Sequence, residues 1–333
     1  MNRIFGDRIG VDGKTHNMDE ICRYLVNKTE TTISGNLNNM LSSNMLSRLG
    51  QTDKEAVKYI IKKLHNILIA DVPNLKNYAD YFDKKYPELF YKKQNGHWRS
   101  TKLGTSLLQA FNYSKFRETV LVDIAKMLNV KTCPYCNMHY TLYANEKVKS
   151  IRKVKTLGLT RFQFDHFYDK LHYPMLSMSF YNLIPSCAVC NQGKSAKALS
   201  LSYHPYHSDI HKLFHFEVAD PLGPYTAARM NDEVEVALMP ELGVNKDEFE
   251  EYIGTFHLTS LYGRHGDVIQ EVFDKAYVMP YYLNPANFNF LSNNDKDYLK
   301  RLWMGNYTKP EEIEKRPMAK FIQDIWRQAK GEI

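Results

Sequence analysis

The sequence has no long apolar run: none of its 333 residues begins a stretch of about 18 apolar residues, the length that a membrane-spanning helix needs. Residues 1–8 also lack the apolar stretch of a secretory signal peptide. No internal repeat or low-complexity tract is visible, and the 44% of hydrophobic residues argue against bulk disorder. From these absences we expect a cytoplasmic protein that has a packed core and contacts no membrane.

Cysteine is scarce, with five residues in the whole chain. Thiols stay reduced in the cytoplasm, so paired cysteines there indicate metal or redox chemistry rather than disulfides. Four of the five cysteines form two Cys-x-x-Cys pairs, Cys133 with Cys136 and Cys187 with Cys190. Two such pairs predict a structural zinc site. The remaining residue, Cys22, is expected to be a buried small hydrophobe.

The zinc interpretation has a redox alternative. Each Cys-x-x-Cys pair can form a tight turn, called a knuckle here, that directs two sulfurs at one metal ion. Two knuckles can hold four sulfurs about 2.3 Å from one Zn²⁺, and such a closed tetrahedron leaves no open position for catalysis. Residues 133–136, Cys-Pro-Tyr-Cys, also match the redox motif of glutaredoxins, which should follow a strand and open a helix. Residues 138–143 instead have the pattern of a strand, and a redox role leaves the second pair unexplained. The sequence therefore favours zinc over a thiol oxidoreductase.

Acidic residues are scarce between residues 131 and 200. This segment contains ten Lys and Arg but only Glu146, Asp165 and Asp169, so it carries the whole net charge of +7. Such a basic patch is what a polyanionic partner requires. The alternative is that residues 147–155 are only a solvated loop. The side chains that we expect to contact nucleic acid are Lys149, Arg152, Lys153, Lys155, Lys194 and Lys197.

The flanking regions have helical patterns. A capping box at residues 52–55 predicts a helix that continues to about residue 69, and Pro73 is expected to end it. In the second flank, Asn245 is expected to cap a helix over residues 246–261, after a strand at residues 213–218. We therefore expect mainly helical regions at residues 1–130 and 201–333 around a different central segment.

An Asp-His dipeptide lies between the two cysteine pairs. Asp165 and His166 belong to residues 162–167, whose alternation predicts a short strand. Asn182 precedes the second pair, and Asn191 directly follows Cys190. Residues 191–199 have a helical pattern despite Gly193, which costs a helix about 1 kcal/mol relative to alanine.

These motifs, in this order, resemble the HNH nucleases, whose catalytic unit is a ββα-metal finger. The resemblance covers residues 131–200, about a fifth of the chain. It departs from the family in the gap of 28 residues between Cys136 and Asp165, which we interpret as an insertion. It departs also at Asn191, because the last letter of the family name HNH stands for a histidine at this position. Asparagine is a common variant there. The resemblance predicts an α+β fold, with a ββα-metal finger and structural zinc between helical flanks.

The resemblance also implies roles for individual residues. His166 would be the general base that accepts a proton from the attacking water, since imidazole titrates near neutral pH. Asp165 and Asn191 would offer hard oxygen ligands to a catalytic Mg²⁺ or Mn²⁺. Asn182 would pin the loop between the strands. Lys194, one turn after Asn191, would contact a phosphate.

We therefore expect a metal-dependent HNH endonuclease that hydrolyses DNA, with RNA as the alternative polymer. Residues 165–168, 182–187 and 204–206 resemble HNH effectors of bacterial anti-phage defence systems, of the Septu type or associated with retrons. Such effectors work with a companion ATPase, so the resemblance implies an ATPase or another defence-system protein as a partner. The alternative function is a zinc-finger module that binds nucleic acid without cleaving it.

Overall fold

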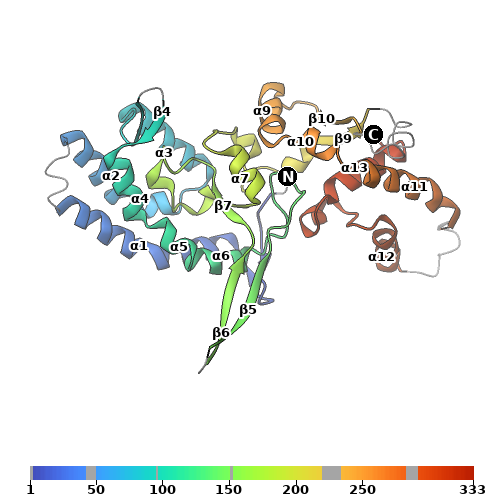
Figure 1. Cartoon of the computed structure of the whole chain (residues 1–333), viewed down its shortest axis with the longest axis horizontal. Helices are drawn as coiled ribbons and strands as arrows, with labels where there is room; N and C mark the ends of the chain where they lie inside the picture. The colour runs from blue at the N-terminus through green and yellow to red at the C-terminus, as the bar shows by residue number, and fades with distance from the viewer. Residues whose placement is uncertain (1–2, 43–49, 95–96, 151–152, 220–233, 283–291) are drawn as a thin grey trace. The chain divides into compact units, whose positions relative to one another are not determined.

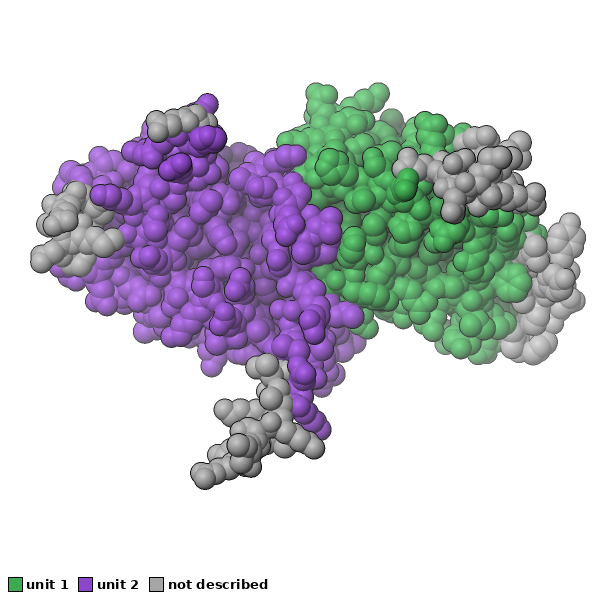
Figure 2. Space-filling view, viewed as in Figure 1, with its two compact units in different colours: residues 1–3, 130–141, 208–333 green, residues 4–129, 142–207 purple. Residues whose placement is uncertain are grey.

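The computed structural model describes residues 3–42, 50–94, 97–150, 153–219, 234–282 and 292–333, with backbone only at 148–150, 153–157 and 278–282 (Figure 1). It combines helices with two-stranded antiparallel sheets. The chain forms two compact units: unit 1 contains Met1–Arg3, Val130–Thr141 and Ser208–Ile333, and unit 2 contains Ile4–Asn129 and Leu142–His207 (Figure 2). No helix in the described part of the chain is both long enough and apolar enough to cross a membrane.

Unit 2 opens with a layer of helices, as predicted for the first flank. After the short strands β1 (Arg8–Ile9) and β2 (Thr15–His16), the helices are α1 (Met18–Ser42), α2 (Gln51–Leu68), α3 (Val72–Lys85), α4 (Lys102–Phe111), α5 (Tyr113–Arg117) and α6 (Val120–Leu128). Helix α1 packs on α2, α4 and α6. Its buried face includes Leu25, Ile33 and Leu37, which recur at helical spacing and form the centre of this core.

The predicted start of α2 was wrong. The helix begins at Gln51, so Thr52 lies inside it rather than at the cap. Gly50 is the N-cap residue, and its N–H donates a hydrogen bond to the Asp53 carboxylate at 3.0 Å. An acidic side chain in this first turn satisfies a free backbone donor and also favours the positive end of the helix dipole.

Pro73 was also misinterpreted, because it begins a helix rather than ending one. Helix α2 stops at Leu68, and Pro73 lies in the first turn of α3, where a missing N–H costs nothing. Asp71 caps α3 by accepting a hydrogen bond from the Asn74 N–H at 3.0 Å. Pro73 therefore belongs to a second helix, α3, that the sequence analysis did not identify.

Two hairpins follow in unit 2. Strands β3 (Tyr91–Gln94) and β4 (His97–Ser100) form the first, and β5 (Tyr143–Ser150) and β6 (Lys153–Thr160) form the second. The second hairpin is the predicted insertion, and it projects from the helices of unit 2 (Figure 1). The insertion is thus a regular paired structure rather than a loop.

A strand, a second strand and a helix then occur in the predicted order. Strands β7 (Gln163–His166) and β8 (Leu183–Ser186) pair antiparallel, with Asp165 opposite Ile184. The loop between them contains the short 3₁₀ helices η2 (Pro174–Leu176) and η3 (Phe180–Asn182). Helix α7 (Ala188–Lys194) follows and packs against β7, and the 3₁₀ helix η4 (Leu201–Tyr203) lies near the end of the unit.

Helix α7 differs from the predicted helix at residues 191–199 at both ends. It begins earlier because the Cys187 sulfur caps it, accepting a hydrogen bond from the Cys190 N–H at 3.4 Å. It ends at Lys194 because Ser195 has a φ of 48°, in the left-handed region, which stops a right-handed helix. Asn191 consequently lies in the middle of the helix rather than at its opening.

The β7–β8–α7 segment shares its core with the helical layer. The Ser179 hydroxyl donates to the Ile67 carbonyl at the end of α2 at 2.7 Å, and the Tyr113 hydroxyl donates to the Phe164 carbonyl in β7 at 3.3 Å. The units therefore differ from the predicted division into residues 1–130, 131–200 and 201–333. The physical reason is size, since three short elements bury too little apolar surface to form a core alone.

Unit 1 contains the first cysteine pair and a mainly helical region. Its elements after residue 207 are η5 (Ile210–Lys212), β9 (Phe214–Val218), β10 (Val236–Pro240), α9 (Lys246–Phe256), α10 (Leu258–Tyr262), α11 (Gly266–Tyr282), α12 (Asn293–Met304), η7 (Pro310–Lys315) and α13 (Ala319–Ala329). Strand β9, predicted at residues 213–218, is confirmed and pairs with β10. Helix α13 packs on β9 and α11, and the Phe216, Tyr262 and Phe321 rings form the core.

The predicted cap of α9 is confirmed, but its predicted end is not. The Asn245 side chain accepts hydrogen bonds from the N–H groups of Asp247 and Glu248 at 3.0 and 3.2 Å. The helix stops at Phe256 because His257 has a φ of 50°, and α10 then starts in a new direction. A single helix over residues 246–261 is therefore wrong.

Candidate metal and nucleic-acid site

The four paired cysteines form one cluster. All four are buried and none forms a disulfide, and their sulfur atoms lie within 4.8 Å of one another. In a tetrahedral site with Zn–S distances of about 2.3 Å, neighbouring sulfurs are about 3.8 Å apart. Cys133, Cys136, Cys187 and Cys190 therefore fit one metal ion such as zinc, as the spacing predicted. Cys22 lies outside the cluster and is buried, also as predicted, and burial raises the pKa of its thiol to about 12.

Buried tyrosines hold the first knuckle in place within unit 1. The Tyr252 hydroxyl donates a hydrogen bond to the Tyr135 carbonyl, and the Tyr262 hydroxyl donates to the Cys136 carbonyl at 2.6 Å. The Met138 N–H points at the Cys136 sulfur, 3.4 Å away. Backbone donors of this kind stabilise a metal-bound thiolate and fix its direction. The two tyrosines belong to helices more than 100 residues further along the chain, so the sequence alone gave no sign of their contacts.

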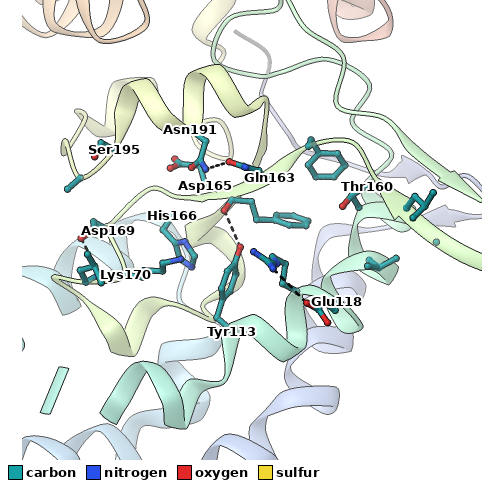
Figure 3. A pocket seen from close by; sticks show the side chains of 18 of the residues that line it. Tyr113, Glu118, Thr160, Gln163, Asp165, His166, Asp169, Lys170, Asn191 and Ser195 are labelled. Carbon is teal, nitrogen blue, oxygen red and sulfur yellow. Dashed lines mark hydrogen bonds and ion pairs between the residues drawn. The ribbon is translucent and has the colours of Figure 1, made fainter. Parts of the chain in front are cut away.

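A cavity of about 740 Å³ in unit 2 brings together three of the predicted site residues. Asp165 and His166 from β7 and Asn191 from α7 line it (Figure 3). Because β8 leads directly into the cysteine that caps α7, the second knuckle sets the position of the helix that carries Asn191. Asn191 and the thiol cluster are thus linked through one short helix.

His166 is placed as a neutral base. Its side chain is buried, and its Nε2 lies 3.0 Å from the Ser177 carbonyl oxygen. A carbonyl oxygen only accepts, so the neutral ring carries its proton on Nε2 and leaves Nδ1 unprotonated. Burial, and then the positive charge of Lys170, lower the pKa of His166 to about 3. The imidazole is therefore unprotonated at neutral pH.

Lys194 is not the phosphate contact that the sequence predicted. Its side chain is completely buried, with 0% exposure, and its Nζ lies 3.4 and 3.3 Å from the two carboxylate oxygens of Asp165. The same ammonium donates a hydrogen bond to the His166 carbonyl at 2.8 Å. A buried carboxylate needs such a counter-charge, because an unpaired charge in the interior is very costly. Lys194 thus fixes the turn of chain that presents Asp165 and His166.

Asn191 offers its amide oxygen. Its Nδ2 donates a hydrogen bond to the Gln163 side chain in β7, which leaves Oδ1 as the acceptor (Figure 3). The oxygens of Asp165 and Asn191 are the hard ligands that Mg²⁺ and Mn²⁺ prefer. Apart from the cysteines, no group of three or more His, Cys, Asp or Glu with metal-ligand spacing is found among the described residues. Water and substrate oxygens would have to complete such a site.

Asn182 makes the hydrogen bonds that a loop-pinning role requires. Its Oδ1 accepts from the Tyr168 N–H at 2.7 Å, and its Nδ2 donates to the carbonyls of Tyr168 and Leu176 at 3.0 and 2.9 Å. The side chain is fully buried, so all its polar atoms serve the loop between β7 and β8. Asn182 therefore supports the site and does not face the cavity.

The predicted nucleic-acid contacts have different placements. Lys149 lies in β5, Lys153 and Lys155 lie in β6, and Arg152 lies outside the described residues. Lys197 is exposed just after α7. These five positions stay predictions, whereas the sixth, Lys194, is excluded by its burial.

The structure adds cavity residues that the sequence reasoning missed. Tyr113, Arg117 and Glu118 come from α5 and the residue after it, and Asp169 and Lys170 follow β7. The Lys170 ammonium lies 4.8 Å from the centre of the Tyr113 ring, and burial lowers its pKa. Lys170 could have been considered, because it follows the Asp-His dipeptide closely in sequence.

The two clusters have different chemistry. Four soft thiols can hold a structural ion, while the cavity combines two hard oxygen ligands with a neutral imidazole and two cations, Arg117 and Lys170. A site of the second kind can place an anion beside a base. Comparisons of the chain with protein-family models, with curated proteins and with solved structures find no match.

Proposed function

We propose that the chain is a metal-dependent endonuclease of the HNH type, with β7, β8 and α7 as its ββα-metal finger. The observation that carries the proposal is the single cavity that Asp165, His166 and Asn191 share. The thiol cluster supports it, because four buried cysteines this close together could hold the structural metal that the resemblance predicts. The defence role and the companion ATPase come from the sequence resemblance alone and stay predictions.

His166 is the general base in this proposal. Its Nε2 proton is held by the Ser177 carbonyl, so Nδ1 accepts the proton of a water molecule that attacks the phosphorus. The lowered pKa keeps the ring unprotonated at physiological pH, so it can accept a proton, but it also makes His166 a weaker base than an imidazole that titrates near neutrality. The strand ends at His166, so Asp165 and His166 border the same cavity although they are neighbours in sequence.

Asp165 and Asn191 would hold the catalytic cation. When bound, Mg²⁺ or Mn²⁺ supplies Lewis-acid stabilisation of the charge on phosphorus and on the leaving oxygen. Each carboxylate oxygen can accept more than one contact, so the ion pair with Lys194 does not by itself exclude a cation at Asp165. Arg117 and Lys170 orient the phosphate at the cavity wall. The proposed substrate is DNA.

One observation favours the alternative of a module that binds without cleaving. The ammonium of Lys194 already neutralises the Asp165 carboxylate, which reduces its attraction for a divalent cation. In this alternative the cavity and the basic strands hold a polyanion, and the thiol cluster serves only the fold. Cleavage, not binding, separates the two functions.

The test is cleavage of supercoiled plasmid in Mg²⁺ and in EDTA. Wild-type protein should nick the plasmid only with the metal. His166→Ala should lower the rate by about 10²- to 10⁴-fold, the effect of losing a general base. His207→Ala is the matched control, since His207 is an exposed histidine of the same unit outside the cavity. Binding without cleavage by the wild type would establish the alternative instead.

A further inference from the structure

An aromatic stack adjoins the cavity in unit 2. The Tyr91 and Trp98 rings lie parallel, with centroids 5.5 Å apart and an angle of 6° between their planes. The His172 ring lies 4.0 Å from Tyr91 and 5.9 Å from Trp98. Tyr91 lines the same cavity as His166, and Trp98 is 49% exposed at the outer end of the stack. About half of the Trp98 side chain is therefore open to contact from solvent.

The hairpin that carries this stack is basic. In its register Lys93 is opposite Trp98, so both lie on the face of Tyr91, while Lys92 is directly opposite Arg99 on the other face. Two like charges opposite each other destabilise a hairpin. Within the described part of the chain, none of these three cations forms an ion pair, and all are exposed. Their charges are available to an anion.

The stack is also rigidly attached to the candidate site. The His172 Nδ1–H donates a hydrogen bond to the Asp169 carboxylate at 2.9 Å, and Asp169 lines the cavity. Burial alone would raise the pKa of Asp169, but hydrogen bonds from the His172 side chain and backbone hold it below its ordinary value. Asp169 is therefore ionised, and it orients the His172 ring against Tyr91. The aromatic stack of Tyr91, Trp98 and His172 is thus organised before any partner binds.

We propose that Trp98, supported by Tyr91 and His172, is a stacking platform for an unpaired base, and that the DNA bound here is single-stranded. Stacking on aromatic rings with nearby cations is how proteins hold single strands without reading their sequence. In a duplex both faces of each base are covered, so an exposed ring can stack only after a base is unstacked at a cost of a few kcal/mol. The substrate assignment rests on the proposed nuclease function, but the platform itself does not.

The charges around the stack also determine the path of the single DNA strand. Asp83 and Glu88 border a small pocket of about 130 Å³ on one side of the stack, and Tyr173 donates a hydrogen bond to Asp83 at 2.7 Å. Phosphates would be repelled there. They would be attracted to Lys93 and to the Lys92–Arg99 pair on the hairpin, so the backbone follows β3 and β4 while a base covers Trp98.

The test measures binding in a His166→Ala background, which removes cleavage from the readout. Fluorescence anisotropy of a labelled 12-residue single strand, and of the same sequence as a duplex, gives both dissociation constants. Trp98→Ala should weaken single-strand binding by about 5- to 150-fold and duplex binding by less than about twofold. Trp98→Phe keeps a stacking ring and should retain most of the affinity. Tyr298→Ala, at an exposed tyrosine of unit 1, should change neither constant.

Two results would overturn the platform. Unchanged single-strand binding by Trp98→Ala would show that no base stacks on this ring, and an equal loss for single strand and duplex would indicate a backbone contact. The proposed function fails separately, if wild-type protein cuts no DNA while Trp98→Ala still loses single-strand affinity. Melting curves of the variants establish that the exposed position leaves the fold intact.

Discussion

At the scale of single residues, the buried Lys194–Asp165 pair connects stability with the candidate site. The ammonium contacts both Asp165 oxygens and the His166 carbonyl, and neither side chain reaches solvent to any large extent. Both active-site candidates on β7 are therefore positioned by one cation from α7. The sequence analysis placed Lys194 at the surface because spacing along a helix shows only neighbouring residues. Its partner Asp165 lies 29 residues earlier in the chain and could not be seen in that way.

Removing the ammonium should destabilise the protein strongly. Lys194→Met leaves the Asp165 carboxylate buried without a counter-charge, and we expect a loss of about 3–5 kcal/mol in the free energy of unfolding. Asp165→Asn in the same chain should recover part of that loss, because the double variant buries no charge. Urea denaturation of both single variants and the double variant measures the coupling. Strictly additive effects would contradict the ion pair.

A second residue, His204, should make stability depend on pH. It is fully buried against the Phe167 ring at 4.1 Å, and burial lowers its pKa from 6.5 to about 3. Between these values the unfolded chain binds a proton that the folded chain does not. Stability is therefore complete above pH 6.5 and falls as the pH drops toward 3, by up to about 1.4 kcal/mol per pH unit.

His204→Phe should flatten the decline of stability in this acidic range, although loss of the Tyr206 N–H contact at 3.2 Å will cost some stability at neutral pH. Urea denaturation from pH 7 to pH 5 gives the slope for wild type and variant. The exposed His97 offers the control His97→Phe, which should keep the wild-type slope, because His97 is not among the groups that shift the pKa of His204. An unchanged slope in His204→Phe would place the acid sensitivity elsewhere.

At the scale of elements, the sequence predicts the segments whose chemistry is local. The alternation around Asp165 predicts β7, and the Cys-x-x-Cys spacing predicts the thiol cluster, because both patterns are set by residues close together in the chain. The end of α7 was not predicted, since it depends on the positive φ of Ser195, which residues other than glycine seldom adopt.

The part of the cavity wall that α5 supplies could not be predicted from the sequence. Tyr113 and Arg117 belong to α5, which the sequence shows only as part of a helical region. They reach the site because the Tyr113 hydroxyl bonds to the Phe164 carbonyl and its ring lies 4.6 Å from that of His166. Contacts between residues 51 positions apart in the sequence depend on how whole helices pack, and no local pattern encodes them.

The β5–β6 hairpin should contribute nonspecific affinity for DNA. Neutralising Lys149, Arg152, Lys153 and Lys155 together removes up to four phosphate contacts. Binding should weaken equally on all DNA sequences, and the slope of log affinity against log salt should become shallower by up to about 0.9 per lost contact. Titrations at several salt concentrations measure the slope. If it does not change, the hairpin faces solvent or a protein partner, and a loss on one sequence alone would indicate base readout.

At the scale of the whole molecule, the basic charge and the cysteines are concentrated in one stretch of sequence, yet the structure divides that stretch between two units. Residues 130–141 belong to unit 1 and residues 142–207 to unit 2. A linear division at residues 130 and 200 follows motifs, whereas a compact unit follows shared apolar cores. The ends of a sequence motif therefore need not coincide with the ends of a compact unit, as the cysteine pairs in this chain show.

The metal should therefore matter to the stability of the whole chain rather than to a separate finger. Cys187→Ser replaces one of four sulfur ligands that lie within 4.8 Å of one another, and it also removes the sulfur that caps α7. We expect loss of bound zinc and a lower melting temperature, because metal binding and folding are coupled in such sites.

Cys22→Ala is the control, since Cys22 is a buried cysteine outside the cluster. It should keep the full metal content, as measured by elemental analysis of the purified protein. A soluble Cys187→Ser protein with one zinc per chain and unchanged melting would show that the cluster does not hold the metal.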